Sequence, residues 1–375
     1  MKVALICDLL DGGPSGMRTA LEGFLRAVAR SARPDMFELI RSKPFGGEWK
    51  DHGFGEVVIP RGRGLGSGLC WSQLKVPRAV KLMGAHLVHS PWQVLPPVRT
   101  SAPLVVSIWD LAPLAYREPG WNSASVVGKY EIILRLAVKK CCHVITHSRS
   151  IAEEVIRRFG VPRHKVSTIY PGLDEVFEKE AELPSRPNPE GPILYVGSNT
   201  PRKNLGLLLR AFAILAGRGV PNNLGIRIGF GEREAARAGD AARAAGIPAE
   251  RIEFLKPARR TEMVQIYNSA AALAFPSLYE GFGLPLIEAM ACGLPVVALH
   301  RSAMPEVVGD AGILVEDDSP EAFAQGIVEA IGLSRSDGAR TATRAKARAA
   351  SFRWATAVSE TMSVYERVCD QARLR

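Results

Sequence analysis

The sequence predicts an α/β protein built from two doubly wound, Rossmann-like domains that face each other across a cleft. Three observations favour this fold class. The chain has 375 residues, which is more than one hydrophobic core usually supports. Short β-branched runs alternate with stretches of helical periodicity, as expected for parallel sheets covered by helices on both faces. The alternation stops once, in a proline-containing segment, and then starts again.

The first domain is predicted over residues 1–175 and begins with a strand, a glycine-containing loop and a helix. The apolar run Val3–Cys7 ends at Asp8, which predicts a buried first strand. Apolar residues recur at helical spacing over Met17–Arg30. The later elements of this domain are predicted at Leu87–His89, Val105–Trp109, Tyr130–Lys140, Val144–Thr146, Ile151–Phe159 and Val166–Tyr170.

A linker is predicted over 176–191, because Pro184, Pro187 and Pro189 stand among charged residues and do not continue a strand or helix. The second domain is predicted over 192–352. Ligands of such sheets bind at the carboxyl ends of the strands, so the cleft is the expected site. The elements after the linker are predicted at Ile193–Val196, Leu205–Ala216, Leu224–Ile228, Ile252–Leu255, Leu273–Phe275, Val296–Leu299, Ile313–Val315 and Ala355–Arg367.

The charge balance favours an anionic partner. Lys plus Arg number 48 and Asp plus Glu 38, which gives a formal charge of +10. Phosphorylated ligands or a membrane surface fit this charge, as does a merely solvated basic surface. Nucleic acid is not an expected partner, because the basic residues are not clustered and no nucleic-acid-binding module is recognised.

The cysteines and apolar runs indicate the compartment. The six cysteines have no metal-ligand spacing and are typical of reduced thiols in a cytosolic protein. The first apolar run is too short for a signal peptide, and none approaches the roughly 18 residues of a membrane helix. We therefore expect a cytoplasmic protein, with peripheral contact at the inner face of the membrane as an added expectation. The mixed Lys and apolar stretch Lys129–Lys140 favours such contact, although packing on a sheet is the simpler interpretation.

The stretch Phe275–Gly293 carries most of the predicted chemistry. A strand ends at Phe275, a loop with two glycines follows, and Pro285 suits the first position of a helix. The N–H groups at such a helix start favour a phosphate or sugar oxygen. Glu280 precedes the loop and Glu288 lies in the helix, and carboxylates suit sugar hydroxyls because they accept strong hydrogen bonds. A loop-to-helix junction with solvated acids is an equally simple interpretation.

Two other loops follow predicted strands. Gly197 opens a turn, and Arg202 and Lys203 then provide adjacent cations that suit a diphosphate, or simply an exposed basic turn. Gly13 and Gly16 lie in a loop after the first strand, where glycine lets the backbone approach a ligand closely. That loop lacks the dinucleotide-binding spacing, so a plain turn stays open as an alternative.

Together these stretches resemble the glycosyltransferases of family 4, also called group 1, which have the GT-B fold. Glu280 and Glu288 are separated by seven residues, as in the paired-glutamate motif of that family, inside Pro-Ser-Leu-Tyr-Glu-Gly-Phe-Gly-Leu-Pro and Glu-Ala-Met-Ala-Cys-Gly-Leu-Pro-Val-Val. Gly197 with Pro201–Asn204 matches its donor-phosphate loop, and Tyr170–Asp174 matches the end of its first domain. The resemblance covers nearly the whole chain.

The resemblance implies a retaining, metal-independent hexosyltransferase that uses a nucleotide-diphosphate sugar and no other cofactor. Arg202 and Lys203 would stabilise the departing nucleotide, Glu288 would bind the ribose, and Glu280 would hold the donor sugar. Residues near the C-terminus, 353–375, would cross back onto the first domain. The implied catalytic residues are Glu280, Arg202, Lys203 and Asp110. The implied donor-binding residues are Gly13, Gly16, Gly197, Arg202, Lys203, Glu280, Gly281, Phe282, Gly283, Leu284 and Glu288.

The family's habits favour a GDP- or UDP-sugar donor, a mannose-type hexose, and a glycan or lipid-linked acceptor in cell-envelope polysaccharide synthesis. One departure stands out: the family often has His-Asp where this chain has Trp109-Asp110. Trp109 offers an indole N–H and a flat apolar face in place of an imidazole. Trp49, Trp71, Trp92 and Trp121 are candidates for stacking on acceptor sugars or for packing in the core.

Two alternatives stay open. A sugar-nucleotide epimerase or hydrolase on the same fold would use the same donor without a sugar acceptor. A non-catalytic sugar-nucleotide or membrane-surface binding protein would also fit the charge and Trp109, and it would bind nucleotide without turnover.

Overall fold

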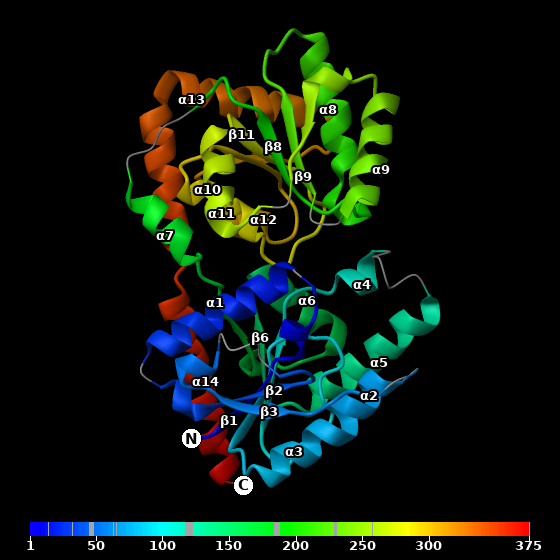
Figure 1. The fold of residues 1–375 in the computed structure, drawn as a ribbon, viewed down its shortest axis with the longest axis vertical. Helices are drawn as coiled ribbons and strands as arrows, with labels where there is room; N and C mark the ends of the chain where they lie inside the picture. Colours follow the sequence, from blue (N-terminus) through cyan, green and yellow to red (C-terminus); the bar gives the residue numbers. More distant parts are fainter. Residues whose placement is uncertain are drawn as a thin grey trace. The chain divides into compact units, whose positions relative to one another are not determined.

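The computed structural model describes residues 1–13, 15–31, 33–44, 49–62, 64, 66–116, 123–183, 188–228, 231–256 and 258–374. The chain forms two compact units (Figure 1). Most of the first 172 residues, together with those from 353 onward, make the first unit, and residues 173–352 make the bulk of the second.

Seven described strands of the first unit form one parallel sheet. Their side chains are buried in nearly continuous runs, since helices cover both faces. In spatial order the strands are β3 (Gly55–Val58), β2 (Phe37–Arg41), β1 (Val3–Ile6), β4 (Leu87–Ser90), β5 (Leu104–Ile108), β6 (His143–Thr146) and β7 (Val166–Thr168). The strand order reverses between β1 and β4, where Val3 pairs with both Phe37 and Leu87. Such a switch point is where doubly wound sheets bind ligands.

Six described strands of the second unit form another parallel sheet with the same kind of order. They are β10 (Ile252–Phe254), β9 (Leu224–Ile228), β8 (Ile193–Gly197), β11 (Ala272–Phe275), β12 (Val296–Leu299) and β13 (Ile313–Val315). The switch point here lies between β8 and β11, which pair through Ile193 with Ala272 and Leu194 with Leu273. These two sheets confirm the predicted α/β class, but β2 and β3 are strands that the sequence did not predict.

Helices flank each sheet (Figure 1). Those of the first unit are α1 (Gly16–Arg30), α2 (Ser67–Cys70), α3 (Val76–Leu82), α4 (Ala112–Ala115), α5 (Ala124–Lys140), α6 (Arg149–Phe159) and α14 (Trp354–Arg373). Those of the second unit are α7 (Glu175–Glu182), α8 (Leu205–Gly217), α9 (Gly231–Ala244), α10 (Arg260–Ser269), α11 (Leu284–Ala291), α12 (Met304–Val308) and α13 (Pro320–Ala349). None of the described helices is long and apolar enough to cross a membrane.

The segment predicted as a linker contains a helix. Asp174 caps α7, because its side chain accepts from the N–H of Val176 at 3.2 Å. At the other end of α7, Lys346 donates to the carbonyl oxygens of Glu180 and Leu183 at 3.0 and 2.7 Å. The helix therefore belongs to the second unit, and the compact units change at 172 and 173, ahead of the predicted linker.

The last helix completes the core of the first unit. Tyr365 of α14 is fully buried, and its hydroxyl lies 2.6 Å from Nδ1 of His89. The Tyr365 ring packs 6.3 Å from that of Phe37 in β2. Gly23 and Gly172 leave the room that Trp354 occupies, since a Cβ at either position would lie within 2.6 Å of Trp354 atoms. Core packing of this unit therefore depends on residues from both ends of the chain.

Candidate active site

The switch point of the second sheet brings two predicted site segments together. Gly197 ends β8 and Phe275 ends the neighbouring β11, so the loops after them leave the same edge of the sheet. After β8 the chain makes a 3₁₀ turn over Pro201–Lys203 before α8 begins. The N–H of Leu278 donates to the carbonyl oxygen of Arg202 at 2.8 Å and joins the two loops directly.

Glu280 pairs with both predicted phosphate-binding cations. Arg202 Nη1 donates to Glu280 Oε2 at 3.1 Å, and Lys203 Nζ donates to Oε1 at 2.6 Å. Arg202 also donates to the carbonyl oxygen of Tyr279, and the Ser302 hydroxyl donates to that of Glu280. Three of the four residues predicted as catalytic therefore meet in one cluster.

The cluster is charged and largely screened from water. Glu280 is 6% exposed, and the side chains of Arg202 and Lys203 are 17% and 12% exposed. Burial alone would raise the pKa of Glu280, but Lys203 and Arg202 together hold that pKa below its usual range. One carboxylate thus faces two cations, so the cluster keeps a net positive charge that suits an anion.

The predicted glycine loop leads into α11, which starts at Leu284, one residue before the predicted position. Gly283 has a φ of +104°, a left-handed conformation in which glycine is favoured, and α11 starts at Leu284 with Pro285 in its first turn. Gly281 and Phe282 are buried. The Phe282 ring packs edge-on against the Phe352 ring with a centroid distance of 5.3 Å, so this side chain belongs to the core.

Glu288 is held by a separate set of partners. Its Oε1 accepts from Arg260 Nη1 at 2.8 Å, and its Oε2 accepts from the Tyr267 hydroxyl at 2.9 Å. Arg260 in turn lies 3.5 Å from the carboxylate of Asp174. Glu288 is 5% exposed, and each of its oxygens keeps a further lone pair for a ligand hydroxyl.

The two predicted glycines of the first unit lie around the start of α1: Gly13 precedes the helix, and Gly16 is its first residue. Ser15 caps α1 by accepting from the N–H of Arg18, and Arg18 Nη1 donates to the carbonyl oxygen of Gly12 at 2.7 Å. A Cβ at Gly13 or Gly16 would meet no atom within 4 Å, and neither glycine has a positive φ. The fold therefore does not itself require glycine at these positions.

Trp109, which stands where the family often has histidine, packs with both its indole N–H and its flat face against the first unit. Its Nε1 donates to the carbonyl oxygen of Pro91 at 2.8 Å, and its ring stacks on His147 with a centroid distance of 3.6 Å. Only 9% of Trp109 is exposed. Asp110, the fourth residue predicted as catalytic, follows β5 and accepts from the N–H of Ala112 at 3.1 Å at the start of α4.

The stacked His147 predicts a pH dependence of stability. Burial lowers its pKa from 6.5 to about 4, so protonation favours the unfolded chain. Its contribution to stability is fully present above pH 6.5 and is lost as the pH falls toward 4. Between pH 7 and pH 5 the free energy of unfolding should fall by about 2 kcal/mol more in the wild type than in His147→Gln. Urea denaturation at both pH values measures this, and exposed His300→Gln should keep the wild-type slope.

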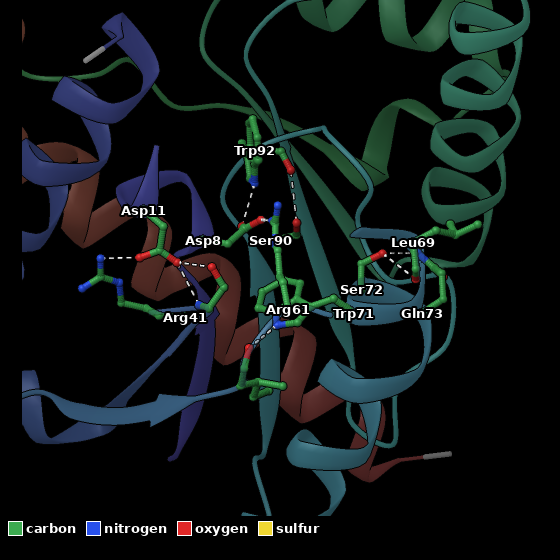
Figure 2. A network of polar contacts seen from close by, with 12 residues as sticks. Asp8, Asp11, Arg41, Arg61, Leu69, Trp71, Ser72, Gln73, Ser90 and Trp92 are labelled. Atoms are coloured by element: carbon green, nitrogen blue, oxygen red, sulfur yellow. Dashed lines mark hydrogen bonds and ion pairs between the residues drawn. The ribbon is translucent and has the colours of Figure 1, made fainter. Parts of the chain in front are cut away.

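A polar network that the sequence did not predict lies at the switch point of the first sheet (Figure 2). Asp8 follows β1, and its carboxylate accepts from Arg61 and, at 3.2 Å, from Nε1 of Trp92. Asp8 is 9% exposed; burial raises its pKa, although Arg61 and Trp92 oppose this. The network lines a pocket of about 80 Å³ beside Trp71. The sequence did not predict this network, because Asp8 stands alone after a strand and its partners are distant along the chain.

The indoles proposed for sugar stacking differ in their surroundings. Trp49 is buried in the apolar core, and Trp71 is 2% exposed with its Nε1 bonded to the carbonyl oxygen of Ile59 at 2.6 Å. Trp92 is only partly buried. Trp121 lies outside the described residues. Among the described tryptophans of this set, Trp92 is therefore the one with an accessible surface beside a pocket.

Known glycosyltransferase families match this chain in both units. The pattern of the glycosyl transferases group 1 matches residues 190–332, and that of glycosyltransferase family 4 matches residues 15–177. The O-antigen chain mannosyltransferase B of Escherichia coli is 30% identical over 246 residues, which are 60% of this chain and 60% of that protein. The chain thus matches less than two thirds of that relative's length.

A second relative is matched over more of its length. The D-inositol 3-phosphate glycosyltransferase 2 of Catenulispora acidiphila is 30% identical over 297 residues, covering 73% of this chain and 67% of that protein. Among solved structures, Anabaena HepE in complex with UDP and glucose superposes with a TM-score of 0.71 at 19% identity, covering 98% and 99% of the two chains. The chain belongs to the group 1, family 4 glycosyltransferases and has their GT-B fold.

Proposed function

We propose that this glycosyltransferase is retaining and metal-independent, and that it moves a mannose-type hexose from a GDP- or UDP-sugar to a glycan or lipid-linked acceptor. The cluster of Glu280, Arg202 and Lys203 carries the proposal. Its two cations would stabilise a departing diphosphate, a role that a metal ion fills in other enzymes. The family relatives that act on O-antigen chains support an envelope glycan as the product.

The reaction would proceed on one face of the sugar. The bond between the anomeric carbon and the phosphate oxygen breaks, and Arg202 and Lys203 stabilise the departing nucleoside diphosphate. The acceptor hydroxyl attacks the same face, and its proton passes to the phosphate oxygen that leaves. Glu280 is held by two cations. This arrangement suits a residue that positions the sugar and the cations, and it suits a nucleophile less well.

The remaining predicted residues would complete the donor site. Glu288 would accept from the ribose hydroxyls with the lone pairs that Arg260 and Tyr267 leave unused. The main chain of Gly283 and Leu284 at the start of α11 would approach the sugar. Gly13 and Gly16 would let the main chain at these positions bind the donor, which gives these uncrowded positions a reason for glycine.

The pocket beside Asp8 is the proposed place for the acceptor. Asp8 and Arg61 neutralise each other, so the pair carries no net charge. Its carboxylate accepts hydrogen bonds and its guanidinium donates them. Trp92 adds an apolar face at the same pocket. This combination suits the hydroxyls and ring of a neutral sugar.

Peripheral contact with an anionic membrane surface is proposed for α5. Its exposed side chains include Val126, Ile132 and Leu136, with exposed fractions of 44%, 60% and 43%, and Lys129 lies among them. Exposed apolar side chains next to lysine are typical of helices that lie on a membrane surface.

Thermal unfolding with UDP, GDP, ADP and CMP, each with and without EDTA, tests the donor site. A nucleotide at about 100 times its dissociation constant should add roughly 2.7 kcal/mol of stability. We expect a clear shift with one diphosphate that EDTA does not change. No shift with any nucleotide would remove the donor-site assignment, and a shift without sugar transfer to any glycan acceptor would favour the non-catalytic binding protein.

A further inference from the structure

A basic pocket lies at the edge of the first sheet opposite to its switch-point pocket. It has a volume of about 610 Å³ and is lined from the end of α5, the turn Arg163–Lys165, the start of β6 and the last turns of α14. His143, the first residue of β6, lies at this amino end of the strands. Asp8 and Trp92 follow the carboxyl ends of β1 and β4, so the two pockets are distinct.

Cations from three separate segments line the basic pocket. Lys139 and Lys140 come from α5, Lys165 from the turn before β7, and Arg367 from α14. Among the described lining residues there is no Asp or Glu, and these four side chains make no ion pair within the described part of the chain. Such a concentration of one sign in a hollow strengthens the local field and attracts anions.

Helix capping explains only part of this cluster. Cations in the last turn of a helix interact favourably with its dipole, which accounts for Lys139 and Lys140. Lys165 and Arg367 are on other elements and gain nothing from that helix end. The pKa of His143 is affected by the same cations. It is lowered to about 4, mainly because the side chain is buried and further because Arg367, His164 and Lys165 are nearby.

We infer that the basic pocket binds an anion with two or more phosphoryl groups, or closely spaced phosphates, at a site separate from the sugar-transfer chemistry. Arg367 offers a planar pair of donors for phosphate oxygens, and the three lysines add point charges. Four positive charges are more than a ligand with one carboxylate would neutralise, so the pocket suits a ligand with several negative charges. A soluble diphosphate and a phosphate-bearing lipid headgroup present the same chemistry to the pocket.

The test is calorimetric titration of the full-length protein with inorganic pyrophosphate. All proteins in the comparison carry Arg202→Ala and Lys203→Ala, so that the proposed donor site does not contribute to pyrophosphate binding. Against this background, Lys139→Gln, Lys165→Gln and Arg367→Gln should weaken pyrophosphate binding by about 30-fold. Neutralising three exposed cations elsewhere, Arg78→Gln, Lys81→Gln and Arg344→Gln, should leave it unchanged.

Sedimentation with phosphatidylcholine vesicles that contain phosphatidic acid separates the two sources of phosphate. Loss of pyrophosphate binding alone in the pocket variant identifies a soluble ligand, whereas loss of vesicle binding alone identifies a lipid headgroup. Ile132→Asp would remove vesicle binding through α5 and leave pyrophosphate binding intact. The inference is overturned if the pocket variant and the surface control bind both probes equally. Denaturant unfolding compares the pocket variant with the Arg202→Ala, Lys203→Ala background, and equal unfolding midpoints would show that the loss of binding is not a loss of folding.

Discussion

Glu280→Gln should lower sugar transfer by about 10²- to 10³-fold while nucleotide binding is kept. The substitution removes the charge that holds Arg202 and Lys203 at 3.1 and 2.6 Å, and it removes an acceptor proposed for the donor sugar. It should also cost about 3 kcal/mol of stability without ligand, because two partly buried cations lose the carboxylate that they both bind. Steady-state kinetics and denaturant unfolding, with and without the nucleoside diphosphate, measure both effects.

Bound diphosphate should restore much of the stability that Glu280→Gln loses, because its negative charge replaces the missing carboxylate beside Arg202 and Lys203. Glu316→Gln, which changes an exposed glutamate of the same unit, is the matched control and should behave as wild type. Normal transfer in Glu280→Gln would contradict the role assigned to this carboxylate.

Arg202→Ala should weaken nucleoside diphosphate binding by about 10- to 100-fold, since a hydrogen bond between charged groups contributes on the order of 1.5–3 kcal/mol. Transfer should fall further, by about 10³-fold, because the charge on the leaving phosphate grows in the transition state. Calorimetric binding and the ratio kcat/KM for the donor distinguish these two effects.

Arg210→Ala serves as the control for Arg202→Ala, because Arg210 is an exposed cation on the neighbouring helix α8. It should change neither affinity nor transfer. Equal diphosphate affinity in Arg202→Ala and wild type would show that the phosphates bind elsewhere.

The strands at the centres of the sheets were predictable because parallel strands are buried on both faces. Runs such as Val3–Ile6 and Val296–Leu299 are apolar throughout, and no polar residue interrupts them. The strands β2 and β3 were not predicted. Glu38 and Arg41 interrupt β2, and β3 lies at the sheet edge, where Gly55 and Glu56 give no apolar run.

The site was predictable where its residues follow strand ends, and not where it depends on pairing across the sheet. Arg202, Lys203 and Glu280 were each expected at the carboxyl edge, and the pairing of β8 with β11 brings them together. That Glu280 binds both cations depends on side chains 77 and 78 residues away, which one sequence does not reveal. The stacking of Trp109 on His147 has the same cause.

The burial of Tyr365 from α14 in the core of the first unit has a consequence for folding during synthesis. Residues 173–352 leave the ribosome before α14 does, so the second unit has its whole sequence available while the first still lacks its final helix. Proteins made of domains generally fold from the N-terminus onward. Here the unit that begins the chain is expected to be the last to become native, and a nascent chain stopped before Arg353 should expose apolar surface to chaperones.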